Sequence, residues 1–367
     1  MRRVAIAAAV AALVVCAGPA QAGPGNPTKD LQVALDELVA NGVPGAILLI
    51  RDGDRTIRLT SGSARLTPRV RMQPNYRFRV GSVTKSFVSA VVLELVGEGK
   101  LSLSDTVDRW LPRVVPEGDG ITVRQLLNHT SGLYDYTEDA RTFQPFLAGD
   151  WDHVFKPLEL VALATSHQPL FAPGSRWSYS NTNFILLGLI VEAATGTPLE
   201  QDLRERIFRP LGLAETSLDS RGQMSGRHAH GYGSVRGGPL RDLTNFNPSV
   251  AWAAGGIVST AEDLADFYRG LLRGKLVARH LLWRMESTVK VGVSDAYGLG
   301  LQQTHLPCSY VWGHTGDFPG FITVAASSGS GRRQVVLSLN SDALRPQAGD
   351  ALLGLITSAY CGGAARG

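Results

Sequence analysis

The spacing of hydrophobic and polar residues changes along the chain, and its first part predicts a helix followed by a β-hairpin. Apolar residues recur at helical spacing over residues 31–39. An apolar run at residues 45–50 is then separated by Asp52-Gly53 from an alternating segment at residues 56–60. A turn dipeptide between two strand-like runs is typical of a hairpin.

The middle of the chain has a mostly helical pattern. Residues 82 to about 98 are apolar on nearly every face, which is typical of a buried helix, and Gly97 and Gly99 supply a signal for its end. Further helices are predicted over residues 123–129, 182–195 and 260–273, the last with Thr260 as its N-cap.

Strand-like runs return near the carboxyl end, at residues 311–314, 321–326 and 334–339, and a last helical stretch covers about 348–360. This order predicts an α+β fold in a single catalytic domain over residues 23–367. Its sheet lobe would comprise residues about 30–80 and 290–362, and its helical lobe residues about 81–289. Small-molecule sites tend to lie where two lobes meet.

The first 22 residues have the pattern of a secretory signal peptide. Arg2 and Arg3 precede an apolar run at residues 4–15, and Ala20-Gln21-Ala22 has the form of a cleavage site. A retained transmembrane helix is the alternative, but it needs about 20 apolar residues. We therefore expect a secreted, extracytoplasmic protein without a membrane anchor after processing.

Charge gives no sign of a nucleic-acid partner. The chain has 36 Lys and Arg against 32 Asp and Glu, and the basic residues are scattered rather than clustered. A small molecule or peptide is the expected partner, and a monomer the expected state. Cys308 and Cys361 remain after processing, and a pair of cysteines in an exported chain predicts one disulfide, with two buried thiols as the alternative.

Ser82-Val83-Thr84-Lys85 places a lysine three residues after a serine. On a helix these positions share one face, so the amine can reach the hydroxyl. Serine needs a neighbour that accepts its proton, and burial favours the neutral amine that could do so. The spacing alone is weak evidence, because Ser287-Thr288-Val289-Lys290 repeats it in what we interpret as surface sequence.

Two further motifs lie far along the chain. Tyr179-Ser180-Asn181 presents a phenol and an amide two residues apart, and the alternative is a packed tyrosine before a helix capped by Asn181. His314-Thr315-Gly316 ends a strand-like run, where the glycine allows a close backbone approach and the histidine can supply hydrogen bonds and partial positive charge. The alternative there is a solvated histidine.

Together, the three motifs resemble those of the serine β-lactamase and penicillin-binding-protein superfamily, in the branch with class C β-lactamases and soluble DD-carboxypeptidases. Several stretches look especially similar to secreted D-alanyl-D-alanine carboxypeptidases, as does the placement of Cys308 and Cys361. The stretches span nearly the whole processed chain: residues 78–85 (FRVGSVTK), 121–136 (ITVRQLLNHTSGLYDY), 179–184 (YSNTNF), 254–264, 297–301 (YGLGL) and 314–316 (HTG).

The resemblance implies an antiparallel sheet flanked by N- and C-terminal helices, plus an all-helical lobe. It also implies that a peptide or β-lactam carbonyl acylates the serine and that the acyl-enzyme is then hydrolysed. Ser82 would be the nucleophile and Lys85 would assist its deprotonation, while Tyr179 would carry a proton to the leaving amine. Asn181 would hold substrate.

The strand edge at residues 314–317 would complete the site. His314 and Thr315 would line it, and the backbone N–H groups of Ser82 and of Asp317, after Gly316, would form an oxyanion hole. Such donors are worth about 3–4 kcal/mol each. The family chemistry needs no metal or organic cofactor.

Two positions depart from the carboxypeptidase pattern. Those enzymes hold the substrate's free carboxylate with an arginine on the preceding strand and a hydroxyl after the H-T-G motif, where this chain has Gln302 and Asp317. An amide cannot form the charge-assisted fork of an arginine, and an aspartate repels a carboxylate. The leaving group is therefore expected to be neutral or cationic, as in an ester, an amide or an internal cross-link.

A serine carboxypeptidase-like hydrolase acting on cell-wall-type peptides is the function we predict. A class C-like β-lactamase, an esterase, a D-aminopeptidase and a slowly deacylating β-lactam sensor remain alternatives. A Ser-His-Asp hydrolase is disfavoured because the sequence has no G-x-S-x-G elbow. A zinc hydrolase is disfavoured because there is no H-E-x-x-H motif.

Overall fold

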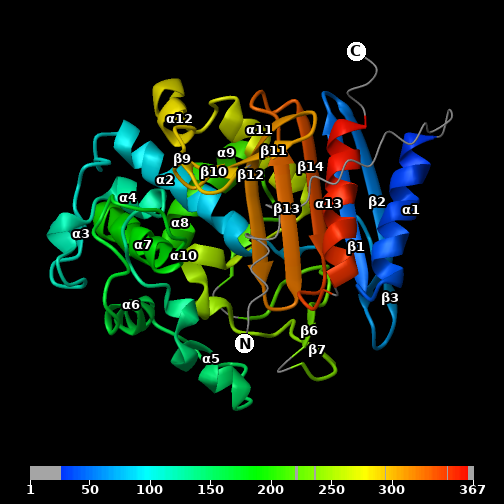
Figure 1. The fold of residues 1–367 in the computed structure, drawn as a ribbon, viewed down its shortest axis with the longest axis horizontal. Coiled ribbons are helices and arrows are strands. Elements are labelled where there is room, and N and C mark those ends of the chain that lie inside the picture. Colours follow the sequence, from blue (N-terminus) through cyan, green and yellow to red (C-terminus); the bar gives the residue numbers. More distant parts are fainter. Residues whose placement is uncertain (1–25, 220–221, 235–236, 294, 345, 363–367) are drawn as a thin grey trace.

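The computed structural model describes residues 26–219, 222–234, 237–293, 295–344 and 346–362. The predicted signal peptide lies outside these residues. A nine-stranded sheet runs through the molecule, and its pairings are all antiparallel (Figure 1). In sheet order the strands are β3 (Val70–Arg71), β2 (Arg55–Arg65), β1 (Gly45–Asp52), β14 (Arg333–Leu339), β13 (Phe321–Ser327), β12 (Ser309–Phe318), β11 (Gln302–Leu306), β10 (Asp295–Tyr297) and β9 (Val289–Lys290).

The first and last helices, α1 (Pro27–Ala40) and α13 (Pro346–Cys361), pack on one face of this sheet. Alternate strand residues such as Leu48 and Leu337 point toward them and form a buried apolar layer. A disulfide joins Cys308, in the turn between β11 and β12, to Cys361 at the end of α13. The predicted disulfide is therefore confirmed, and it fastens the last helix to the turn that precedes the His314-bearing strand β12.

The other face of the sheet carries α11 (Ala261–Leu272) and the helical region, which Figure 1 shows gathered around α2 (Thr84–Gly97) and α7 (Thr182–Thr195). Both α2 and α7 are buried along most of their length, as their apolar sequences predict. The other α-helices are α3 (Val107–Trp110), α4 (Val123–Leu127), α5 (Ala140–Leu147), α6 (Pro157–Thr165), α8 (Leu199–Leu203), α9 (Arg209–Leu211), α10 (Trp252–Gly255) and α12 (Arg279–Met285).

Short elements connect these helices to the sheet. Three-stranded and two-stranded sheets lie outside the main one. Their strands are β4 (Phe78–Arg79), β8 (Ile257–Ser259) and β5 (Ser217–Leu218), then β6 (Tyr232–Ser234) and β7 (Leu240–Asp242). The 3-10 turns are η1 (Gly81–Val83), η2 (Gly118–Gly120), η3 (Tyr136–Glu138) and η5 (Pro248–Val250), and η4 (Arg204–Phe208) is a π-helical turn.

Several predicted helix bounds differ from the structure by a few residues, and two of these differences lie beside Ser82 or Tyr179. The α-helix expected from residue 82 begins at Thr84, because Gly81, with φ of 54°, starts a tight 3-10 turn first. The helix expected to reach residue 129 ends at Leu127, because His129 adopts a left-handed conformation with φ of 60°.

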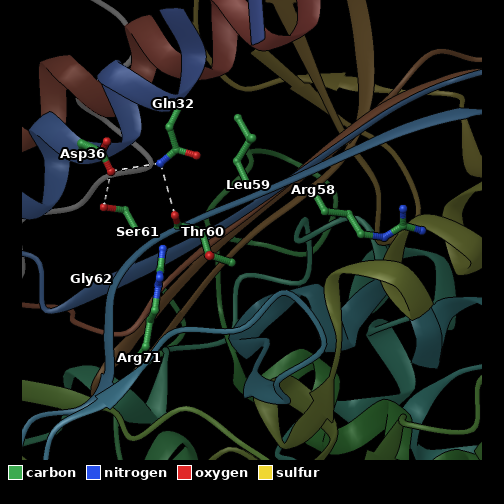
Figure 2. Close-up of a pocket in the computed structure, with 8 residues that line it drawn as sticks. All are labelled: Gln32, Asp36, Arg58, Leu59, Thr60, Ser61, Gly62 and Arg71. Carbon is green, nitrogen blue, oxygen red and sulfur yellow. Dashed lines mark hydrogen bonds between the residues drawn. The ribbon is translucent and has the colours of Figure 1, made fainter. Parts of the chain in front are cut away.

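A shallow polar pocket of about 410 Å³ lies between α1 and β2 (Figure 2). Its lining includes Gln32, whose amide donates to Asp36 and to the Thr60 carbonyl. The pocket is separated from β12 by β1, β14 and β13, so it is no part of the site around Ser82. Across the described ranges, no single helix has both the length and the apolar composition of a membrane span.

Candidate active site

Ser82 lies in the 3-10 turn η1, immediately before the buried helix α2. Lys85 follows one turn later and its side chain is completely buried. The Lys85 amine reaches the Ser82 hydroxyl, as predicted: the Nζ atom lies 2.9 Å from the Oγ atom.

The other contacts of Lys85 determine how its amine faces the serine. Its Nζ donates to the Asn181 Oδ1 atom at 2.8 Å and to the Ala254 carbonyl at 2.6 Å. Carbonyl oxygens only accept hydrogen bonds. The amine, whether neutral or charged, must therefore direct one N–H bond at Asn181 Oδ1 and another at the Ala254 carbonyl. In a neutral Lys85 the lone pair is therefore directed at the Ser82 hydroxyl, as a general base requires.

Tyr179 approaches Ser82 from the other side. Its hydroxyl donates to the Ser82 Oγ atom at 2.8 Å, and its ring lies 5.0 Å from the Lys85 Nζ atom. The serine oxygen thus lies within hydrogen-bond distance of two groups that can carry a proton, which is the arrangement that nucleophilic acyl transfer needs.

Asn181 is held by both ends of its amide. It makes no side-chain cap on α7, so the alternative of a simple helix cap does not apply. Its Nδ2 atom donates to the Asp135 Oδ2 atom at 2.9 Å and to the Thr137 Oγ1 atom at 3.3 Å, which orients Oδ1 toward Lys85. Sequence reasoning missed Asp135, although it lies in a stretch that resembled the family.

Glycines bring the backbone of β12 against the turn that holds Ser82. A Cβ atom on Gly316 would lie 1.9 Å from the Val80 carbonyl oxygen and 3.2 Å from the Ser82 nitrogen. A Cβ atom on Gly81 would lie 2.7 Å from the Asp317 nitrogen. The two backbone N–H groups predicted to form the oxyanion hole therefore belong to segments in direct contact.

The open edge of β12 directs the Asp317 N–H group. Strand β11 pairs with β12 only as far as Gly313, opposite Gln302. Beyond it the Thr315 N–H group points to the β11 side, where the Gln302 Oε1 atom accepts it at 2.8 Å. Because alternate residues of a strand point the same way, the N–H group of Asp317 faces that open edge too.

The sequence model of the family described as Beta-lactamase matches residues 31–357. The chain belongs to the β-lactamase family. This match covers most of the sequence and all three motifs, so the resemblance to the β-lactamase and penicillin-binding-protein superfamily is confirmed.

Known proteins similar to this β-lactamase-family chain include amide hydrolases. A D-stereospecific amidohydrolase from Streptomyces sp. has a TM-score of 0.85 and 39% identity, covering 91% of this chain and 99% of that one. A D-amino acid amidase from Ochrobactrum anthropi SV3 has a TM-score of 0.80 and 29% identity, covering 91% and 98%. These structures confirm the predicted fold class.

A D-aminopeptidase from Brucella anthropi is 31% identical over 297 residues. The matched region is 76% of this chain and 52% of that protein. The chain therefore spans about half the length of this curated relative. With these likenesses and the geometry around Ser82, the protein is a hydrolase of the serine β-lactamase fold.

His314 is the predicted site residue whose surroundings differ most from expectation. It is buried, and its Nδ1 atom lies 2.5 Å from the Thr315 carbonyl, which only accepts. The proton is therefore on Nδ1, and Nε2 accepts from the Tyr297 hydroxyl at 2.9 Å. Burial, with a further contribution from Lys85, lowers the pKa of His314 to about 3, so the ring is neutral and only the partial charge of its N–H group is available.

The remaining predicted residues lie near one another on β11 and β12. Gln302, the first residue of β11, contacts Thr315 through its amide, and Asp317, two residues after Thr315, is exposed. In the second serine–lysine pair, Ser287 follows α12 and Lys290 lies in β9, and both residues are exposed, which agrees with the interpretation of this segment as surface sequence.

Proposed function

We propose that the protein hydrolyses amide bonds of D-amino acid derivatives through an acyl-enzyme on Ser82, and that the leaving group carries no free carboxylate. The observation that carries this proposal is the pair Gln302 and Asp317 at the open edge of β12. The named activities of the similar amidohydrolase, amidase and aminopeptidase support the same substrate class.

In the acylation step, the Ser82 Oγ atom bonds to the substrate carbonyl carbon while its proton passes to the neutral amine of Lys85. The carbonyl oxygen becomes an oxyanion that accepts from the N–H groups of Ser82 and Asp317. Tyr179 then gives its hydroxyl proton to the departing nitrogen as the C–N bond breaks, and it recovers a proton from Lys85.

In the deacylation step, water attacks the ester carbonyl of acyl-Ser82. Tyr179 passes its hydroxyl proton to the neutral amine of Lys85, and its oxygen, 2.8 Å from the Ser82 Oγ atom, takes a proton from the water as the water oxygen bonds to carbon. The ester C–O bond then breaks and the Lys85 ammonium gives its proton to the Ser82 Oγ atom, 2.9 Å away, which releases the D-amino acid and restores the starting state. Both half-reactions therefore use the same residues in opposite directions.

The leaving-group preference follows from charge at the strand edge. The Gln302 amide is neutral and its Oε1 atom is already an acceptor for the Thr315 N–H group. The exposed carboxylate of Asp317 lies two residues further along the same edge, where a negative leaving group would be repelled. Ammonia, an uncharged amine or an amidated residue meets no such repulsion.

A matched substrate pair tests this selectivity. Hydrolysis rates should be compared for a dipeptide that ends in D-alanine and for the same dipeptide with its C-terminus amidated, together with D-phenylalanine amide. We expect a preference for the amidated forms. Gln302→Arg combined with Asp317→Thr should shift the preference toward the free acid.

Clear preference of the parent protein for the free carboxylate would overturn the proposal. That outcome would favour a D-alanyl-D-alanine carboxypeptidase, which the motif-bearing stretches predict from the sequence. Ser82→Ala is the control for chemistry at the serine. Intact-mass measurement with a labelled penicillin should show one adduct on the parent and none on this variant.

We also propose that the chain is exported and cleaved after Ala22. The charged and apolar pattern of residues 1–22 supports this. The Cys308–Cys361 disulfide adds support, because such bonds persist mainly in oxidising compartments. Expression in a secreting bacterial host, followed by mass spectrometry of the protein from the extracytoplasmic fraction, should give a chain that begins at Gly23. A chain confined to the cytoplasm with Met1 retained would contradict export.

A further inference from the structure

His129 lies directly behind Tyr179, although it belongs to none of the three motifs and has no part in the steps above. Its side chain is completely buried. Its ring stacks on the Tyr179 ring with 4.3 Å between the centroids and 30° between the planes. The left-handed backbone at His129, with φ of 60°, is rare outside glycine and turns this residue back toward the Tyr179 loop.

Two hydrogen bonds from His129 hold the loop on either side of Tyr179. The His129 carbonyl accepts from the Ser178 N–H group at 3.0 Å. The His129 Nδ1 atom lies 3.2 Å from the Ser180 nitrogen, which donates to it. One residue therefore fixes the backbone immediately before and immediately after the tyrosine whose hydroxyl contacts Ser82.

The orientation of the imidazole is fixed by a third partner. Asn183 directs its Nδ2 atom at His129 Nδ1, 3.1 Å away, while its Oδ1 atom accepts from the Ser131 hydroxyl at 2.6 Å. Since the Ser180 and Asn183 nitrogens both donate, Nδ1 of His129 carries no proton and the neutral ring has its proton on Nε2.

The surroundings of His129 also favour a neutral imidazole. Burial, then the proximity of Lys85 and His314, places the pKa of His129 well below its usual range. A charged ring would need a proton on Nδ1, directed against the Ser180 N–H group. Within the described residues the Nε2 atom has no hydrogen-bond partner. The Tyr297 ring lies edge-on with its centroid 4.8 Å from that of His129.

We propose that His129 is a positioning residue, which sets the Tyr179 hydroxyl against the Ser82 oxygen through its Nδ1 acceptor and its stacked ring. The claim rests on the acyl-serine part of the proposed function and is independent of the leaving group. It extends the site from the residues that touch the substrate to a buried support behind the proton carrier.

Two substitutions separate the acceptor from the ring. His129→Phe keeps an aromatic ring against Tyr179 and removes the acceptor. His129→Asn removes the ring but places Oδ1 two bonds from Cβ, as Nδ1 is, and asparagine also tolerates positive φ. We expect His129→Phe to lower the rate constant of Ser82 acylation by a labelled penicillin about tenfold to a hundredfold, and His129→Asn to lower it less.

The binding constant for penicillin should change by no more than about twofold in either variant, because His129 touches no substrate. Leu355→Ala is the control: it removes a buried side chain from the opposite face of the sheet and should lower the melting temperature without changing the acylation rate per folded molecule. The proposal would be overturned if His129→Phe matched this control, or if His129→Asn were acylated more slowly than His129→Phe.

A measurement on the unaltered protein tests the proposal even if His129→Phe does not fold. Nitrogen-15 NMR of histidine-labelled protein should show His129 with an unprotonated Nδ1 and a protonated Nε2, unchanged between pH 5 and 8, and the Ser180 amide should exchange slowly. Titration of His129 within this range, or a proton on Nδ1, would overturn the proposal. If penicillin acylated neither the parent nor any variant while the NMR result held, the failure would lie in the proposed function rather than in the role of His129.

Discussion

Gly316→Ala should separate the two halves of the oxyanion hole. A methyl group at this position would lie 1.9 Å from the Val80 carbonyl oxygen and 2.9 Å from the Val80 carbonyl carbon. Carbon and oxygen in contact normally stay about 3.3 Å or more apart. Both partners are backbone atoms and cannot rotate away, so β12 must move from the Ser82 turn by about an ångström or more.

The size of the effect follows from what this movement displaces. The next residue after Gly316 supplies the Asp317 N–H group, and the Ser82 nitrogen lies only 3.2 Å from the added methyl group. Losing one oxyanion donor costs about 10²–10³ in rate, so acylation should slow at least about a hundredfold. Overpacking costs about 1–3 kcal/mol of folding stability, which a typical domain with about 5–15 kcal/mol can lose and remain folded.

The assay is the rate of adduct formation with a labelled penicillin, followed by intact-mass measurement at a temperature well below the unfolding midpoint. Gly354→Ala is the matched control, because its exposed position on α13 has no atom within 4 Å of the added methyl group. Acylation of Gly316→Ala within about threefold of the control would refute the assignment of the Ser82 and Asp317 N–H groups as the oxyanion hole.

Three other perturbations give distinct outcomes. In Asp135→Asn the remaining oxygen accepts from Thr137 and the new NH2 group faces the Asn181 Nδ2 atom, so the charged acceptor that orients the Asn181 amide is lost. Since a hydrogen bond to a charged group is worth about 1.5–3 kcal/mol, kcat should fall about tenfold or more; unchanged kcat would contradict this orienting role. Replacing Cys308 and Cys361 by serine opens a loop of 53 residues and should lower the free energy of unfolding by about 4 kcal/mol in urea titrations, whereas a loss below about 1 kcal/mol would contradict the chain-entropy argument. Burial, then the nearby Asp317, raises the pKa of Asp342 from 3.8 to about 6, so its ionisation destabilises the folded state as pH rises through that range. In urea titrations, Asp342→Asn should therefore be more stable than the parent at pH 8, by at most about 3 kcal/mol, and as stable as the parent at pH 4. The same difference in stability at both pH values would refute the linkage.

The elements with strong local signals could be predicted from the sequence. Helix α7 has the expected bounds, because an apolar run ends at Gly196, which adopts the left-handed conformation of a helix terminator. Helix α11 begins where Thr260 was expected to cap it, and the Thr260 hydroxyl accepts from the Asp263 N–H group. In both helices the deciding interaction lies within a few residues of the helix end.

The strand that forms the site was only partly predictable. An apolar run at residues 311–314 predicted a short strand, whereas β12 extends over Ser309–Phe318. The added residues include Gly316 and Asp317, which have weak strand preference. They are extended because β13 pairs with them along the whole edge, and pairing with a distant segment leaves no trace in local spacing.

The supporting residues of the site could not be found from spacing at all. Asp135 contacts Asn181, 46 positions away, and His129 contacts Ser180, 51 positions away. Nothing in the local pattern distinguishes these residues from a loop aspartate and a packed histidine. The stretch over residues 121–136 contains both, so its resemblance to the family was the available signal, but it did not say what either residue contacts.

Alternation along β12 explains how one catalytic arrangement can serve different leaving groups. His314 and Gly316 face the helical region, where packing against Tyr297 and Val80 leaves little freedom for their replacement. Thr315 and Asp317 have exposed side chains, and their N–H groups point to the open edge. Because the oxyanion donor at residue 317 is backbone, its side chain can change without removing it. Substitution at Asp317 and Gln302 can therefore alter which leaving group is accepted while the chemistry at Ser82 is preserved.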